Sequence, residues 1–146
     1  MRVIQASILL LWLCLLGVGG LALAPQVAPY LVIVNAANPQ SSMDRKFLGD
    51  AFLKKTTRWG NGELIRPVDQ SPDSAVRRRF SEEVLKRSVT AVRSYWQQII
   101  FSGRDVPPPE LAGDAEVLEF VNKHAGAIGY VSGAASTSGA RVISVR

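Results

Sequence analysis

The sequence predicts an α/β domain in which helices flank a small mixed sheet. Strands are indicated by a β-branched run at 30–35 (YLVIVN), by 126–131 (GAIGYV) with its flexible glycines, and by 141–145 (RVISV). Between these runs, apolar residues recur every three to four positions, as on the buried face of a helix. With 146 residues, the chain is long enough for one such core.

The first half of the chain predicts a strand, a helix and a second strand. The strand at 30–35 is followed by apolar residues at helical spacing, and Ser41 or Ser42 can cap this helix. A Gly-Asn-Gly sequence at 60–62 predicts a turn. The segment 64–69 (LIRPVD) is then expected to form the second strand.

Three helices are predicted in the second half, each after a residue that can cap it. They are expected from the cap candidates Ser71 to Ser74 to about residue 87, from Ser88 to about residue 102, and for a short stretch after Asp114. The segment 104–113 (RDVPPPELAG) is expected to be a rigid loop, because prolines fix φ and lack an amide donor.

Residues 1–24 have the layout of a secretory signal peptide: a basic residue, an apolar run and small residues at its end. Cleavage after Ala22 or Ala28 is open. An uncleaved membrane anchor is the other possibility, because the apolar stretch approaches the ~20 residues that span a bilayer. Either alternative exports residues 25–146, which we expect to form one domain. Because this part has no cysteine and so no disulfide, it suits a bacterial cell envelope, and we expect a periplasmic location.

The composition argues against catalysis and against metal or nucleic-acid binding. The only cysteine, Cys14, lies in the apolar N-terminal run, and the only histidine, His124, is expected near a helix end. Carboxylates are scattered, and there is no glycine-rich phosphate loop or nucleophile elbow. The formal charge of +5 favours anionic partners only weakly. We therefore expect no enzyme activity, no metal, no cofactor and no nucleic-acid partner.

The segment 69–80 (DQSPDSAVRRRF) is the candidate binding site. A helix that starts here presents unpaired backbone amides and the positive end of its dipole, and the Ser71 and Ser74 hydroxyls can add donors. Arg77 is the arginine nearest to this start. The alternative is that Ser74 only caps its own helix and the three arginines face water.

Four segments in this order resemble a known family. They are DRKFLGDAFLKKTTRWGNGELIRPVD, SPDSAVRRRF, YWQQIIFSGRDVPP and GAIGYV. The order is similar to that in the phosphate substrate-binding proteins of bacterial ABC importers, which belong to the type II periplasmic binding proteins. The resemblance runs from about Tyr30 to Val131 and implies one α/β lobe of these two-lobed proteins.

The resemblance also implies a ligand site, with an arginine and a Ser-Gly-Thr run at a helix start. Placed by Phe80, the family's serine falls on Ser74, its glycine on Ala75 and its threonine on Val76, while Gln70 stands in place of the arginine. Ser71, Ser74, Ala75 and Arg77 are the ligand-binding residues that we expect.

The predicted function is therefore the non-covalent binding of phosphate or a related oxyanion by an exported single-lobe protein. An ABC transporter or another envelope protein is the expected partner, and a membrane is a partner only if the N-terminal segment is uncleaved. The alternative is an interaction or scaffold protein that kept the lobe's fold and lost its ligand. Gln70 in place of arginine is the feature that separates the two.

Overall fold

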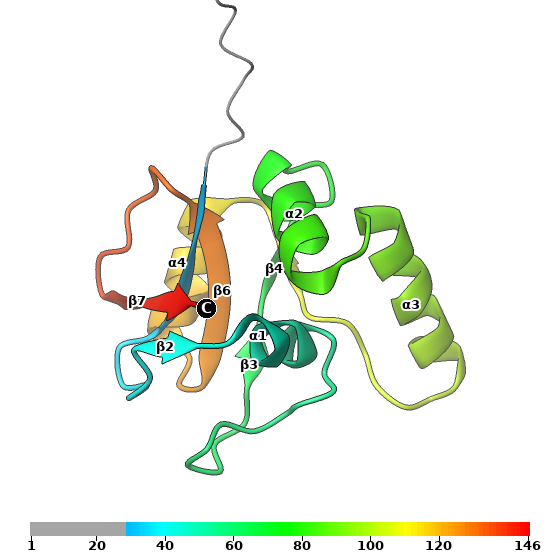
Figure 1. The fold of residues 1–146 in the computed structure, drawn as a ribbon, viewed down its shortest axis with the longest axis horizontal. Helices are drawn as coiled ribbons and strands as arrows, with labels where there is room; N and C mark the ends of the chain where they lie inside the picture. The colour runs from blue at the N-terminus through cyan, green and yellow to red at the C-terminus, as the bar shows by residue number, and fades with distance from the viewer. Residues whose placement is uncertain (1–28) are drawn as a thin grey trace, which may run out of the picture.

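The computed structural model describes residues 29–146, so the predicted signal peptide or anchor lies outside the described residues. Its centre is a five-stranded mixed sheet with the order β2-β7-β1-β6-β3 (Figure 1). The strands are β1 (Tyr30–Asn35), β2 (Ser42–Met43), β3 (Arg66–Pro67), β6 (Ala127–Ser132) and β7 (Ala140–Val145). β1 pairs antiparallel with β6 and β7, whereas β2 and β3 pair parallel with their neighbours.

Helices cover both faces of this sheet. They are α1 (Arg45–Phe52), α2 (Ala75–Phe80), the π-helix η1 (Ser81–Leu85), α3 (Val89–Phe101) and α4 (Asp114–Lys123). A separate two-stranded parallel sheet joins β4 (Asp69–Gln70) to β5 (Glu110–Leu111). The predicted fold class, a small mixed sheet with flanking helices, is confirmed.

The alternation of side chains along the strands explains the two layers. In β1, Val32 and Val34 face the cluster formed with α1, α2, η1 and α3, while Ile33 faces the cluster formed with α4. α4 lies close to β6 because Gly129 has no side chain: a Cβ there would be 2.7 Å from Val117 Cγ1. Each face of the sheet is therefore buried by helices.

Two predicted caps are wrong. Asp44, and neither Ser41 nor Ser42, caps α1 by accepting from the Phe47 amide at 2.6 Å, and Ser42 lies in β2. Asp114 does not cap α4: the cap position is Gly113, and the Asp114 carboxylate accepts from the Ser132 amide instead. Ser42 pairs with β7 and Asp114 binds Ser132, so both residues are engaged by partners distant in sequence.

The predicted strand at 64–69 is divided in the structure. Arg66–Pro67 pairs with β6 as β3, and Asp69–Gln70 pairs with β5 as β4. β5 also interrupts the predicted proline-rich loop. This division matters for the candidate site, because it takes Gln70 away from the main sheet and places it beside the start of α2.

None of the helices formed by residues 29–146 combines the length and the apolar character needed to cross a bilayer.

Candidate functional site

The start of α2 is built around Ser74. Its backbone is extended (φ −66°, ψ 132°), and its hydroxyl oxygen accepts from the Arg77 amide at 3.3 Å, as an N-cap does. The same hydroxyl donates to Gln70 Oε1 at 3.0 Å. α2 continues directly into η1, which ends at Lys86 in a left-handed conformation, so the two form one continuous helix. The first-turn amides of Ala75 and Val76 have no intrahelical acceptor.

The three consecutive arginines have different environments. Arg77 is 2% exposed and points into the protein. Arg78 is exposed and donates to the Asp73 carbonyl at 3.1 Å. Arg79 forms an i,i+4 ion pair with Glu83 at 2.7 Å. Only Arg78 therefore matches the alternative that these side chains simply face water.

Arg77 is held in a buried ion pair with Asp69. Its Nη1 lies 2.9 Å from Asp69 Oδ1 and donates to the Gln70 carbonyl at 2.7 Å, with Glu110 farther away at 3.4 Å. Arg77 Nε is buried and has no acceptor among the described residues. The Tyr130 hydroxyl also donates to Asp69. The charge of Arg77 thus lies beneath the helix start and is partly neutralised.

Burial raises the pKa of Asp69 to about 6, against the opposing effects of the Arg77 guanidinium and the Tyr130 hydroxyl. Asp69 is therefore ionised at neutral pH. Burial and the neighbouring Asp69 raise the pKa of Tyr130, so its hydroxyl stays protonated and acts as a donor. The Tyr130 ring stacks on Phe80 with centroids 3.9 Å apart, which fixes α2 over β6.

A second network occupies the position next to Ser74. Gln70 Nε2 donates to Asp114 Oδ1 at 2.8 Å and to the Tyr130 carbonyl at 3.0 Å. Asp114 also accepts from the Ser132 amide at 3.0 Å and from its hydroxyl at 2.5 Å. Burial opposes the ionised form, but these hydrogen bonds outweigh it and lower the pKa of Asp114. The ionised Asp114 carboxylate is thus linked to the Ser74 hydroxyl through the Gln70 side chain.

The residues predicted for the site are only partly brought together. Ser74 and Ala75 stand at the helix start, with Ala75 exposed. Ser71 lies one turn earlier, where its carbonyl accepts from the Ser74 amide and its own amide donates to Leu111. Arg77 points beneath this start. Sequence reasoning missed Asp114 as the partner of Gln70, and nothing in the local sequence around either residue indicates that pairing.

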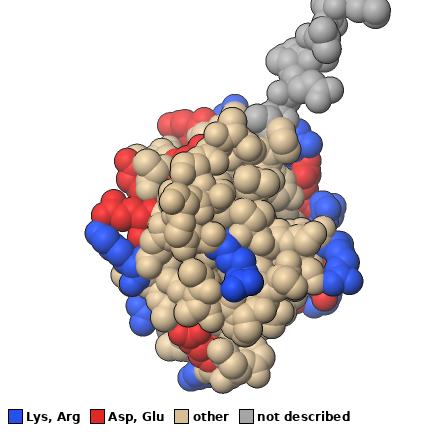
Figure 2. Space-filling model, turned by 90° about the vertical axis from the view of Figure 1, so that its left-hand side faces the viewer, with Lys and Arg blue, Asp and Glu red and all other residues tan. Residues whose placement is uncertain are grey.

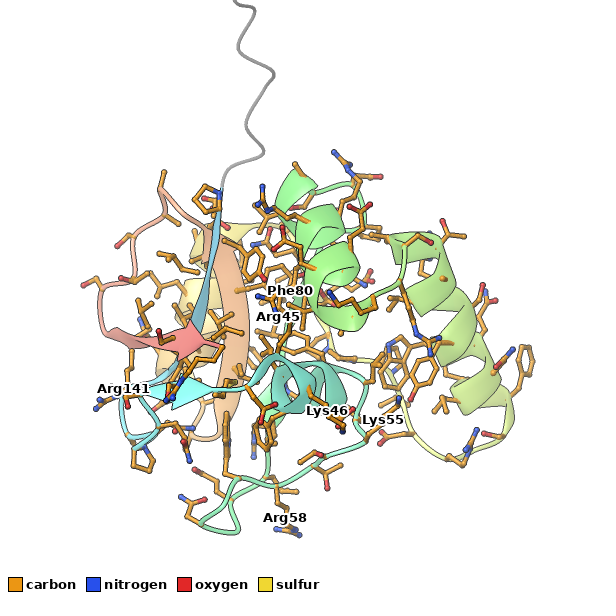
Figure 3. All side chains as sticks on the ribbon, viewed as in Figure 1. Arg45, Lys46, Lys55, Arg58, Phe80 and Arg141 are labelled. Atoms are coloured by element: carbon orange, nitrogen blue, oxygen red, sulfur yellow. The ribbon has the colours of Figure 1, made fainter. Side chains whose placement is uncertain are left out.

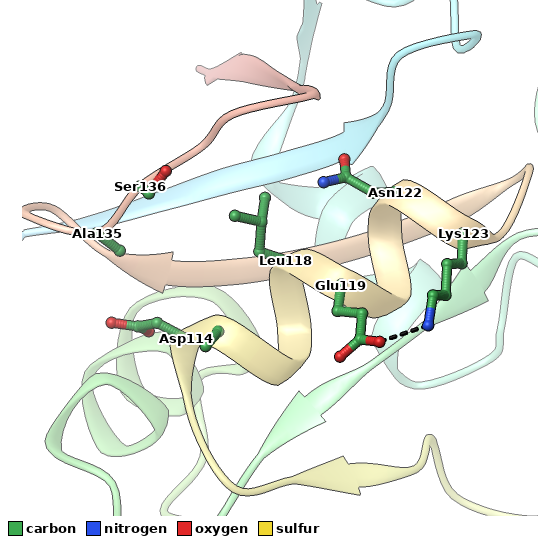
Figure 4. Close-up of a pocket in the computed structure, with 8 residues that line it drawn as sticks. Asp114, Leu118, Glu119, Asn122, Lys123, Ala135 and Ser136 are labelled. Carbon is green, nitrogen blue, oxygen red and sulfur yellow. Dashed lines mark hydrogen bonds and ion pairs between the residues drawn. The ribbon is translucent and has the colours of Figure 1, made fainter.

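A hollow of about 530 Å³ lies between α4 and the loop that follows β6 (Figure 4). Asp114 stands at one end of it, and Leu118 forms part of its wall. Lys123, the basic residue in its lining, is paired with Glu119. The hollow therefore offers no free positive charge to an anion.

No group of three His, Cys, Asp or Glu side chains within residues 29–146 is arranged to hold a metal ion.

Solved structures similar to this chain include proteins described as phosphate receptors. They are an ABC-type phosphate transport receptor from Vibrio cholerae (18% identity, TM-score 0.64), a putative phosphate ABC transporter substrate-binding protein with bound phosphate from Clostridium perfringens (19%, 0.65) and PstS from Borrelia burgdorferi (10%, 0.63). Over the aligned residues, the chain has the fold of these proteins. The resemblance predicted from the sequence is confirmed at the level of the fold.

These alignments cover 82% of this chain but only 46% to 47% of the receptors, so the chain spans just under half of their length. This share is consistent with a single lobe. No family model matches the sequence, and no curated protein matches it either.

Proposed function

We propose that this protein binds phosphate or a related oxyanion non-covalently at the start of α2, and that it is not an enzyme. The observation that carries the proposal is the shared fold with receptors for phosphate, one of them solved with phosphate bound. The helix start of this chain supplies suitable chemistry, because backbone amides and the helix dipole favour an anion.

The donors we assign are the amides of Ala75 and Val76 and the hydroxyl of Ser74, with Ser71 beside them. The Ser74 hydroxyl becomes available when its hydrogen bond to Gln70 is exchanged for one to the ligand. Arg77 contributes only its positive charge, from a position beneath the helix start, because its Nη1 remains bonded to Asp69 and to the Gln70 carbonyl. Binding therefore requires a rearrangement of Gln70, which lowers affinity.

Asp114 gives the site a preference among oxyanions. At neutral pH phosphate still carries a proton that it can donate to a carboxylate, whereas sulfate carries none and is repelled. We expect Asp114→Asn to strengthen sulfate binding by about tenfold, or ~1.4 kcal/mol. Calorimetric titration of the parent protein and this variant with sulfate measures the effect. Equal sulfate affinities would show that Asp114 does not face the ligand.

The fold also suggests the cellular context. Residues 25–146 act as one exported, periplasmic domain, released from or anchored by residues 1–24, beside a transporter or another envelope protein. A single lobe leaves one side of the anion in water, where hydration competes with the protein and salt screens its charges. Affinity is therefore expected to be weaker than in a closed two-lobed site.

Calorimetry of the purified protein with phosphate, sulfate and a neutral sugar tests the proposal. Phosphate should release or absorb heat and raise Tm at millimolar concentration, and the neutral sugar should do neither. Ser74→Ala should remove the effect. Ser88→Ala is the matched control, because Ser88 caps α3 in the same manner, accepting from the Ala91 amide at 3.1 Å, and lies outside the site.

One observation favours a second function, that of a non-catalytic scaffold or interaction protein. The polar side chains at the helix start already have hydrogen-bond partners within the protein, since Gln70 forms hydrogen bonds with Ser74, Asp114 and the Tyr130 carbonyl. A fold that persists without ligand needs such internal partners. Absence of any thermal stabilisation by phosphate would favour this second function.

A further inference from the structure

A groove between α1 and η1 is surrounded by positive charge. It has a volume of about 340 Å³, and Leu53 and Leu85 contribute to its apolar part. Its basic lining residues are Arg45, Lys46, Lys55, Lys86 and Arg87. Asp50 is the only acidic residue in the lining. Figure 3 labels Arg45, Lys46 and Lys55, which α1 and the turn after it contribute.

The protein neutralises little of this charge. Lys46 is paired with Asp50 at 2.5 Å, and the other four cations have no carboxylate partner among residues 29–146. Arg45 donates to the Glu83 carbonyl at 3.4 Å, and the Arg87 guanidinium lies 5.2 Å from the centre of the Tyr95 ring. Residues 1–28 contain no Asp or Glu, so none of their side chains can supply the missing negative charge.

The stability of the helices explains only some of these residues. Arg45 and Lys46 occupy the first turn of α1, where the helix dipole disfavours positive charge. Lys86 ends η1 with φ 55°, a conformation in which glycine is less strained. Positive charge is thus present at two positions where the helix dipole disfavours it, whereas Lys55, Lys86 and Arg87 follow helix C-terminal ends, where the dipole favours cations.

The charge of the groove also stands out from the rest of the surface. Its five cations and one carboxylate give a net charge of +4. Residues 29–146 contain 16 basic and 12 acidic side chains, which is also +4, so the remaining surface is balanced. The face on the β7 side is mostly uncharged around a basic group near its centre (Figure 2). The excess positive charge of the domain is concentrated at one place.

We propose that this groove is a second site, which binds a compact polyanion bearing phosphate groups. A peptide carries at most one carboxylate per residue, whereas a phosphate group concentrates up to two negative charges on a few atoms. Several charges within so small a groove therefore favour phosphate groups. The site lies at the opposite end of the α2–η1 helix from Ser74, roughly 16 Å away along eleven residues.

Inorganic tripolyphosphate is the probe for this site, titrated by calorimetry at low and at high salt. Lys55→Gln/Lys86→Gly should weaken binding by at least about tenfold, while Lys86→Gly alone should leave Tm unchanged or higher because it relieves the left-handed backbone. Arg66→Gln/Lys123→Gln removes the same number of charges outside the groove and should change affinity less than about twofold. Ser74→Ala should leave tripolyphosphate binding intact, which separates this site from the proposed phosphate site.

Sedimentation with vesicles that contain or lack an anionic phospholipid identifies the source of the phosphate groups. Binding to anionic vesicles that Lys55→Gln/Lys86→Gly abolishes would support a lipid headgroup. Tripolyphosphate binding without vesicle binding would support a free phosphate compound. The proposal is overturned if tripolyphosphate does not bind at low salt, if the double variant binds it as well as the parent, or if hexaglutamate binds more tightly.

Discussion

Arg77 shows how one side chain can serve the fold and the site together. Its guanidinium holds the buried Asp69 carboxylate and the Gln70 carbonyl, so it fixes the backbone beside Ser74. A buried carboxylate without its partner is strongly unfavourable. The contribution of Arg77 to ligand binding therefore has to be measured separately from its contribution to stability.

Replacing Arg77 should therefore affect stability far more than replacing its neighbour. We expect Arg77→Ala to lower the free energy of unfolding by about 3–5 kcal/mol, because Asp69 is left buried and unpaired. Arg78→Ala, at an exposed position, should change it by less than ~0.5 kcal/mol. Urea unfolding of both variants measures this, and similar values would contradict the buried ion pair.

The raised pKa of Asp69 predicts a pH dependence of stability. The pKa is about 6 in the folded protein and 3.8 for the free group, so between these pH values the folded state holds a proton that the unfolded chain has lost. The free energy of unfolding should therefore fall as the pH rises through this window, by up to about 3 kcal/mol. Asp69→Asn should remove this component. A variant with the same pH dependence as the parent would refute the assignment.

At the scale of elements, the contact between β3 and β6 depends on Gly126. Gly126 has φ 75°, and a Cβ there would lie 2.1 Å from the Leu64 carbonyl oxygen. We expect Gly126→Ala to lower the free energy of unfolding by about 1–3 kcal/mol. Gly60 has open space and no positive φ, so Gly60→Ala is the control and should be nearly neutral. Equal denaturation midpoints for the two variants would contradict the close contact.

The elements that the sequence predicts well are those with strong local signals. The β-branched run at 30–35 became β1, and Ser74 and Ser88 cap α2 and α3 as predicted. The two-residue strands β2 and β5 were missed because pairing with distant strands creates them. The site follows the same rule. The position of Ser74 could be predicted from the local sequence at the helix start, whereas the Gln70–Asp114 hydrogen bond joins residues 44 positions apart.

At the scale of the whole molecule, the chain keeps the fold of phosphate-binding proteins in just under half of their length. Each face of its sheet is covered by its own helices. The anion site is therefore expected at the edge of one lobe, open to water on one side. The basic groove lies at the other end of the α2–η1 helix, so the two proposed sites can be tested independently.

The central claim, that the start of α2 binds phosphate, is tested most directly by following backbone amide resonances during a phosphate titration. The account predicts that the resonances of Ala75 and Val76 shift and saturate at millimolar phosphate. These shifts should be lost in Ser74→Ala and kept in Ser88→Ala. Resonances of Ala75 and Val76 that stay unmoved, or that move equally in Ser74→Ala, would contradict the claim.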